Sequence, residues 1–287
     1  MLKTFFLTKY FNFIKFEHSV FALPFCLSCV LLAKEDFPKA STVFWIISAC
    51  VSARALAMSL NRIIDKEVDK KNERTKNREL PIGLMSLNEA IIFSLVSFSL
   101  LVFSTFQLPR ICLYLLPVAA AWFYIYPFTK RFTWLSHLWL GIALGGSCIA
   151  GWIAVTGKIN SVIPFILSLA VVFWVAGFDI IYACQDYNHD MKNNLHSIPA
   201  RFGIKSALIV SRSFHLITVL FLILLGVLIE TSILYWFSVI FVAGMLFYEQ
   251  GLVKPNDLSK VDMAFFTLNG WISVGFFVFI LMEKILK

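Results

Sequence analysis

The sequence predicts an all-α membrane protein with about nine transmembrane helices around a central cavity. Of its 287 residues, 59% are hydrophobic and only 15% are charged, whereas a soluble domain carries about 25% charged residues. Apolar runs of about 20 residues, the length that crosses a bilayer as a helix, recur along the whole chain. Because no stretch has the composition of a separate soluble domain, residues 1–287 are expected to form a single membrane domain.

The predicted helices follow one another with short loops between them. Residues 1–16 alternate Phe and Leu with Lys and Asn, so they are expected to form an amphipathic helix on the membrane surface. The predicted spans then follow at about 18–33, 42–60, 88–106, 111–128, 134–156, 160–181, 206–228, 232–249 and 263–284.

The net charge of +8 comes from Lys and Arg that cluster in loops on one side of the predicted membrane. Seventeen of the 25 Lys and Arg fall on the side of the N-terminus, six fall on the opposite side, and Arg54 and Arg212 lie within helices. The positive-inside rule therefore places the N-terminus in the cytoplasm, and we expect the inner (plasma) membrane of a bacterium. Since this charge is a topology signal, no nucleic-acid partner and no obligate protein partner are expected.

Two acidic motifs follow the second and the sixth predicted spans. Their polar members recur mostly every fourth residue: Asn61, Asp65 and Asp69 in the first motif, and Asp179, Tyr182, Asp186 and Asp190 in the second. If the helices continue through the motifs, this spacing keeps each set within an arc of about 80°. The motifs lie four spans apart, so both are expected on the cytoplasmic side of the membrane.

Carboxylates so close to hydrocarbon are unfavourable, by about 2.5–3.5 kcal/mol each at a helix centre and by less near its ends. Hard oxygen ligands suit Mg²⁺, which takes one or two protein carboxylates and completes its shell with water and phosphate oxygens. We therefore expect Asn61, Asp65 and Asp69 to bind one Mg²⁺, and Asp186 and Asp190 to bind a second. The two ions would bridge a diphosphate.

Cationic side chains near the motifs are candidate diphosphate ligands: Arg54, Arg74, Arg78, Lys130 and Arg201. Arg54 lies two turns before Asn61 inside an apolar helix, where an arginine generally marks a functional site. The basic loop that contains Arg74 and Arg78 also fits a second interpretation, a simple topology signal.

With these residues in place, the chain resembles the UbiA superfamily of membrane prenyltransferases over nearly its full length. The resemblance is carried by residues 15–24, by Arg54 with the first motif, and by residues 74–78, 126–131, the second motif and 196–203. The most similar subgroup comprises 4-hydroxybenzoate polyprenyltransferases and their menaquinone-pathway relatives. The chain departs from many ubiquinone-pathway members at residues 78–81 and 196–199, which leaves the acceptor open.

The resemblance implies transfer of a polyprenyl chain from its diphosphate to a hydroxylated aromatic acid of the 4-hydroxybenzoate type, with Mg²⁺ and in respiratory quinone biosynthesis. The implied partners are the polyprenyl diphosphate, the aromatic acid and the lipid bilayer. Asp179 and Tyr182 are the candidate catalytic residues that orient or deprotonate the acceptor. An alternative role for Asp179 is to support the metal ligands.

Three alternatives remain open from the sequence. The acceptor is alternatively a hydroxynaphthoate or dihydroxynaphthoate of menaquinone biosynthesis. A cation-coupled transporter also uses carboxylates within the membrane, but an inverted repeat would place related elements on opposite faces. A non-catalytic membrane scaffold leaves the two carboxylate sets without a role.

Overall fold

The computed structural model describes residues 2–15, 19–229 and 231–286, and in these ranges the chain forms helices and no β-strand. Among the described residues, eight helices are long and apolar enough to cross a membrane, which confirms the all-α membrane fold. The chain divides into two compact units, Met1–Ser19 with Ala40–Phe128, and Val20–Lys39 with Thr129–Lys287. We call them the first and the second unit and describe each by itself.

The first unit contains the first acidic motif. Its helices are α1 (Leu2–Ile14), α3 (Ala40–Ile64), α4 (Lys66–Lys71), α5 (Leu87–Phe106) and α6 (Arg110–Ile125), after which the 3₁₀ helix η2 (Tyr126–Arg131) begins. Helices α3 and α5 pack closely, and their contact is lined by small side chains such as Ser48 and Ser104, whose hydroxyl oxygens are 2.7 Å apart. Small residues let helix backbones approach closely in a membrane.

Helix α1 is docked on the rest of the first unit. Lys9 and Tyr10 both donate hydrogen bonds to the Glu89 carboxylate at the start of α5, and the Tyr10 ring stacks on Phe93. Burial, together with the neighbouring Glu89 carboxylate, raises the pKa of the Tyr10 phenol to about 12. Tyr10 therefore remains a proton donor to Glu89 at physiological pH.

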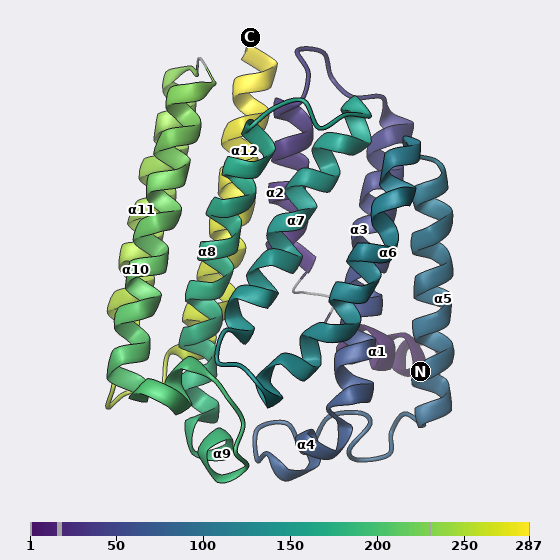
Figure 1. The fold of residues 1–287 in the computed structure, drawn as a ribbon, viewed down its shortest axis with the longest axis vertical. Coiled ribbons are helices and arrows are strands. Elements are labelled where there is room, and N and C mark those ends of the chain that lie inside the picture. Colours follow the sequence, from purple (N-terminus) through teal and green to yellow (C-terminus); the bar gives the residue numbers. More distant parts are fainter. Residues whose placement is uncertain (1, 16–18, 230, 287) are drawn as a thin grey trace. The chain divides into compact units, whose positions relative to one another are not determined.

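The second unit contains the second acidic motif. Its elements are α2 (Ser19–Leu32), α7 (Ser136–Thr156), α8 (Ile163–Ala183), η3 (Cys184–Asp186), α9 (Tyr187–Lys192), α10 (Ile198–Leu228), α11 (Ile233–Leu252), the π-helix η4 (Met263–Leu268) and α12 (Asn269–Leu286). Helix α8 is the most buried of the spans and packs against both α7 and α10. In Figure 1, α9 continues from the end of α8 at the foot of this unit.

Glycines on α7 bring its backbone against that of α8. A Cβ atom at Gly141 would lie 2.4 Å from the Val172 carbonyl oxygen, and one at Gly145 would lie 2.7 Å from the Ser168 carbonyl oxygen. These glycines are four residues apart, so they lie on one face of α7, and His137 lies on the same face one turn earlier. The close approach of the two helices therefore carries His137 toward the end of α8.

The predicted spans agree with the observed helices except at α2 and α10. The first predicted span, 18–33, corresponds to α2, which has only 14 residues and is about 21 Å long, less than a hydrocarbon core of about 30 Å. Helix α10 begins earlier than predicted, at Ile198, but it is kinked at Gly203, where φ is 80°. The predicted helix 206–228 is the part after this kink.

Candidate active site

The first motif does not continue α3 as a regular helix. Helix α3 ends at Ile64, Asp65 takes φ −93° and ψ 7°, and the short helix α4 follows. Backbone hydrogen bonds from Asp65 N–H to the Asn61 carbonyl (3.0 Å) and from Asp69 N–H to the Asp65 carbonyl (2.7 Å) nevertheless preserve the four-residue repeat. The break therefore changes the local conformation without separating the three predicted ligands along the chain.

The carboxylates of the first motif are buried. Asp65 is 2% exposed and Asp69 is 4% exposed, and the Asn61 amide nitrogen lies 3.3 Å from one Asp65 oxygen. Two buried carboxylates and an amide oxygen form a hard oxygen donor set at the end of an apolar helix. This set fits Mg²⁺, which rarely requires more than one or two protein carboxylates.

Asp69 forms an ion pair with Arg78, which the sequence analysis assigned to diphosphate binding. Arg78 Nη1 lies 2.8 Å from both oxygens of the Asp69 carboxylate. The loop folds back because the Thr75 hydroxyl donates to the Asp69 carbonyl at 3.1 Å, and the Arg78 N–H donates to the Thr75 carbonyl. The loop is thus a structured cap on the motif, more than a set of topology charges.

The other predicted cations of the first unit differ in their surroundings. The Nε atom of Arg54 is buried, and it has no hydrogen-bond partner among the described residues. An unsatisfied guanidinium donor inside a membrane helix suits an anionic ligand. Arg74, in contrast, is exposed in the loop, where its backbone N–H donates to the Asn72 side chain.

The second motif repeats the local geometry of the first. Asp186 takes φ −91° and ψ 4°, close to the values at Asp65, and it precedes the short helix α9 as Asp65 precedes α4. Asp190 accepts a hydrogen bond of 2.8 Å from Ser197, which also caps the start of α10. Lys130 and Asp186 both lie within electrostatic range of Asp190, and the Lys130 carbonyl accepts a hydrogen bond from His196 N–H.

The predicted catalytic residues have defined neighbours. The Tyr182 ring stacks on Phe265, with centroids 4.1 Å apart, which fixes the ring beside the second motif. One Asp179 oxygen lies 2.7 Å from Nδ1 of His137. The sequence motifs do not include His137, so this contact was missed.

Arg201 is the predicted cation that the structure places against aromatic rings. It is exposed, and its guanidinium lies over the rings of Trp134 and Phe202, at 6.0 and 5.5 Å from their centroids. A role in binding diphosphate therefore requires the side chain to leave these rings.

Neither motif forms a closed metal cage. Within the described ranges, no group of three His, Cys, Asp or Glu side chains is arranged to hold a metal ion. Each motif offers two carboxylates on one short segment, so further ligands must come from Asn61, from water or from a phosphate.

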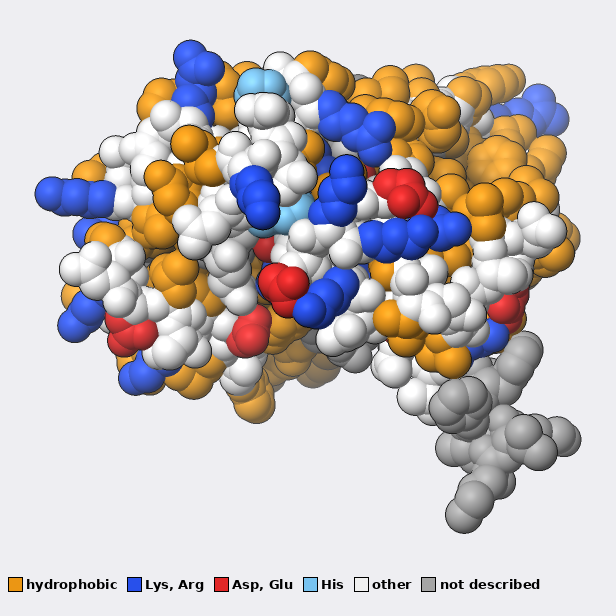
Figure 2. All heavy atoms as spheres, turned by 90° about the horizontal axis from the view of Figure 1, so that it is seen from below, with side chains coloured by type: hydrophobic (Ala, Val, Ile, Leu, Met, Phe, Trp, Pro, Cys, Tyr) orange, Lys and Arg blue, Asp and Glu red, His pale blue; other side chains and the backbone are white. Residues whose placement is uncertain are grey.

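The face of the molecule seen in Figure 2 carries exposed cations. Figure 2, seen from below, shows Lys and Arg side chains with a few carboxylates among them. In the loop after the first motif the exposed cations include Lys70, Lys71, Arg74 and Lys76. A surface of this charge attracts diphosphates and anionic lipid headgroups.

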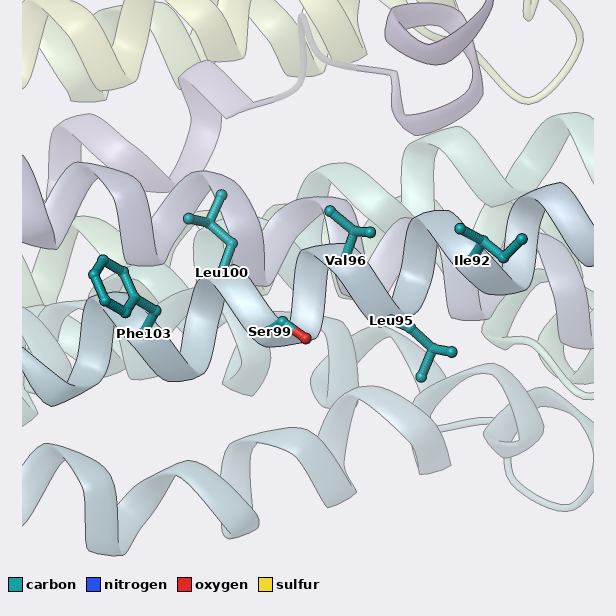
Figure 3. Close-up of a pocket in the computed structure, with 6 residues that line it drawn as sticks. All are labelled: Ile92, Leu95, Val96, Ser99, Leu100 and Phe103. Atoms are coloured by element: carbon teal, nitrogen blue, oxygen red, sulfur yellow. The ribbon is translucent and has the colours of Figure 1, made fainter.

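The pocket in Figure 3 is mostly apolar, unlike the two acidic motifs. Its lining comes from one face of α5 and is apolar apart from Ser99: Ile92, Leu95, Val96, Leu100 and Phe103. These apolar side chains are exposed on a helix that is long enough to span a membrane. The pocket carries no titratable group, so it suits a lipid chain and no bond-making chemistry.

Replacing Arg78 by glutamine is expected to raise the KM for the prenyl diphosphate by about 10-fold or more. The change removes a cation and leaves the buried Asp69 carboxylate without its charged partner. Steady-state kinetics in membranes measure the effect, and Lys76→Gln is the matched control because Lys76 is exposed and pairs with the exposed Glu73. An unchanged KM in Arg78→Gln would contradict a role for this side chain in substrate binding.

Comparison with known proteins shows the family to which the chain belongs. Residues 22–272 match the model of the UbiA prenyltransferase family. The chain is 31% identical over 254 residues to a 4-hydroxybenzoate octaprenyltransferase of Vibrio atlanticus, covering 87% of this chain and 88% of the relative. It is 30% identical over 261 residues to the enzyme of the same name from Coxiella burnetii, covering 88% and 87%.

Solved structures show the same fold. A UbiA homologue from Aeropyrum pernix in its apo form superposes with a TM-score of 0.81 at 29% identity, covering 94% of this chain and 98% of that one. A UbiA homologue from Archaeoglobus fulgidus bound to DMAPP and Mg²⁺ has a TM-score of 0.78 at 17% identity, covering 97% and 100%. From the family match and the full-length relatives, we conclude that the chain belongs to the UbiA prenyltransferase family.

Proposed function

We propose that this protein transfers a polyprenyl chain from its diphosphate to 4-hydroxybenzoate and releases diphosphate. The observation that carries the proposal is the similarity to 4-hydroxybenzoate octaprenyltransferases over nearly 90% of both chains. The carboxylates of the two motifs and the cations beside them support it, because they are the donor types that a metal–diphosphate complex needs. On this proposal the two units act together as one catalytic domain.

The proposed first Mg²⁺ ligands are Asn61, Asp65 and Asp69, and the proposed second set is Asp186 and Asp190. Four membrane-spanning helices, α5 to α8, lie between the ends of the two motifs along the chain. Motifs separated by an even number of crossings emerge on the same side of the membrane. When bound, the metal neutralises charge on the diphosphate and so makes it a better leaving group.

The predicted cations neutralise the remaining negative charge of the diphosphate: Arg54, Arg74, Arg78, Lys130 and Arg201. Arg54 is supported most strongly, since its buried Nε has no partner among the described residues. Arg78 has a defined place beside the first motif, and its contact with Asp69 keeps the cation there before substrate arrives. The diphosphate leaves with the electron pair of the allylic C–O bond.

Asp179 acts on the acceptor in this proposal. Its carboxylate accepts the hydroxyl proton of the aromatic ring, which raises electron density on the neighbouring ring carbon. That carbon forms the new C–C bond and loses its own hydrogen as a proton, which leaves with the diphosphate. The proton held by Asp179 returns to the ring oxygen, so the product keeps its hydroxyl group and Asp179 is again free to act as a base. Tyr182, held by Phe265, orients the ring.

The membrane setting supports the same chemistry. An allylic cation reacts with water unless water is excluded, and the polyprenyl chain is itself a hydrophobic substrate. Helices that span the bilayer provide an apolar environment for both. We place the protein in the inner membrane of a bacterium, with its N-terminus and motifs facing the cytoplasm.

A prenyl-transfer assay tests the proposal. Membranes from a host that lacks its own enzyme, with and without this protein, are given a labelled polyprenyl diphosphate with either 4-hydroxybenzoate or 1,4-dihydroxy-2-naphthoate. We expect labelled prenyl-hydroxybenzoate that disappears when the metal is chelated. Product from the naphthoate alone would make the proposed acceptor wrong, and no product from either would contradict prenyl transfer to both acceptor classes.

A further inference from the structure

We propose that His137 is a positioning residue that holds Asp179 in the orientation needed to accept the acceptor's proton. The inference rests on the proposed function, in which Asp179 is the base. It assigns a role to a histidine that lies outside both acidic motifs, 42 residues before Asp179.

His137 contacts two different helices at once. Its Nδ1 lies 2.7 Å from Asp179 Oδ2 on α8, and its Nε2 lies 3.4 Å from the backbone nitrogen of Ile198 at the start of α10. The ring itself belongs to the first turn of α7. One side chain therefore ties the ends of three helices together beside the second motif.

The partners determine which ring nitrogen carries the proton. A backbone N–H is only a donor, so Nε2 must be an acceptor and must lack a proton. The neutral imidazole then has its proton on Nδ1, and Nδ1 donates to Asp179. This donated hydrogen bond fixes the orientation of the Asp179 carboxylate, so that its other oxygen can face the acceptor.

Of the two hydrogen-bonded side chains, His137 is buried and Asp179 is partly accessible. The His137 side chain is 4% exposed, whereas that of Asp179 is 19% exposed. Among the described residues, His137 is the one hydrogen-bond partner of the Asp179 side chain, through Oδ2. The second oxygen, Oδ1, is therefore left for the hydroxyl group of the acceptor.

The surrounding fold explains why the ring cannot turn away. Gly141 and Gly145 bring α7 against the α8 backbone, and His137 is one turn before Gly141 on the same face. At the start of α10, Ser197 bonds to Asp190 while the next residue, Ile198, bonds to His137. The residues that begin α10 thus hold both the proposed base and a proposed metal ligand of the second motif.

Two amide substitutions separate the two hydrogen bonds of the ring. In His137→Asn the side-chain amide reaches the position of Nδ1, so a donor to Asp179 is kept and the contact with Ile198 is lost. In His137→Gln the amide reaches the position of Nε2, so the contact with Ile198 is kept and the donor to Asp179 is lost. The two variants are matched in polarity, and each removes one contact.

The experiment measures transfer to 4-hydroxybenzoate and, without acceptor, the slow release of prenyl alcohol from the same labelled diphosphate. We expect His137→Gln to lower kcat for transfer by about 10- to 100-fold, with the KM for the prenyl diphosphate and the release of prenyl alcohol within about 2-fold of wild type. His137→Asn is expected to recover most of the lost kcat. Asp179→Asn is measured alongside as the reference for loss of the base.

The outcomes distinguish the inference from the function on which it rests. Full transfer by His137→Gln beside an impaired Asp179→Asn would overturn the role of His137 and leave the proposed function standing. Equal loss of transfer, diphosphate binding and folded protein in both His137 variants would also overturn it, because that pattern indicates a packing role. No transfer by the wild-type protein would overturn the proposed function and this inference together.

Discussion

Replacing Asp65 by asparagine is expected to lower prenyl transfer by at least about 10²- to 10³-fold while folded protein remains in the membrane. Asparagine has the same shape, so the short helix α4 can still follow it, but a carboxylate charge is lost from a side chain that is 2% exposed. The same loss is expected for Asp186→Asn, since the two residues share one backbone conformation and one position before a short helix.

The effect is measured as transfer at saturating substrate and at several Mg²⁺ concentrations, with the amount of folded protein in the membrane determined for each variant. Glu67→Gln is the control, because Glu67 lies two residues from Asp65 but has a largely exposed side chain that pairs with Lys70. We expect its activity to stay within about 2-fold of wild type, as is usual for a surface ion pair. Wild-type activity in Asp65→Asn would contradict the metal assignment of the first motif.

Replacing Gly141 by valine is expected to destabilise the protein by more than about 2 kcal/mol. The new Cβ would lie 2.4 Å from the carbonyl oxygen of Val172, and a backbone atom cannot move aside as a flexible side chain can. Helices α7 and α8 must then separate, which also removes His137 from Asp179. Thermal unfolding in detergent, followed by the fraction of protein that remains monodisperse, measures the loss.

Gly146→Val provides the matched control on the same helix. Apart from its chain neighbours and its own helix backbone, a Cβ atom at Gly146 would meet no described atom within 4 Å. We therefore expect a stability within about 0.5 kcal/mol of wild type, as for an ordinary surface substitution. Equal stability of the two variants would contradict the close approach of α7 and α8. It would also remove the structural basis for the position of His137.

The sequence predicted the parts of this protein that depend on local pattern. Helices long enough to span a membrane follow directly from apolar runs, and the four-residue spacing identified two acidic motifs that contain Asp65 and Asp186. The breaks at these two residues were not predicted, because the same spacing fits a continuous helix and a helix interrupted at a carboxylate.

Local sequence patterns did not predict the contacts between segments that are distant along the chain. Arg78 returns to Asp69 through a loop whose turns depend on the Thr75 hydroxyl, and His137 reaches Asp179 only because α7 and α8 pack closely. The spacing of Gly141 and Gly145 is a signal in the sequence that could have indicated this packing, since small residues four apart let membrane helices approach. Extending that face by one turn leads to His137.

In the proposed active site, each motif supplies ligands to its own divalent ion on a shared diphosphate. The most direct test of this claim counts bound Mn²⁺ by electron paramagnetic resonance in the presence of an unreactive prenyl thiolodiphosphate. We predict two ions per chain in the wild-type protein and one in each of Asp65→Asn and Asp186→Asn. Two ions retained by either variant would contradict the claim.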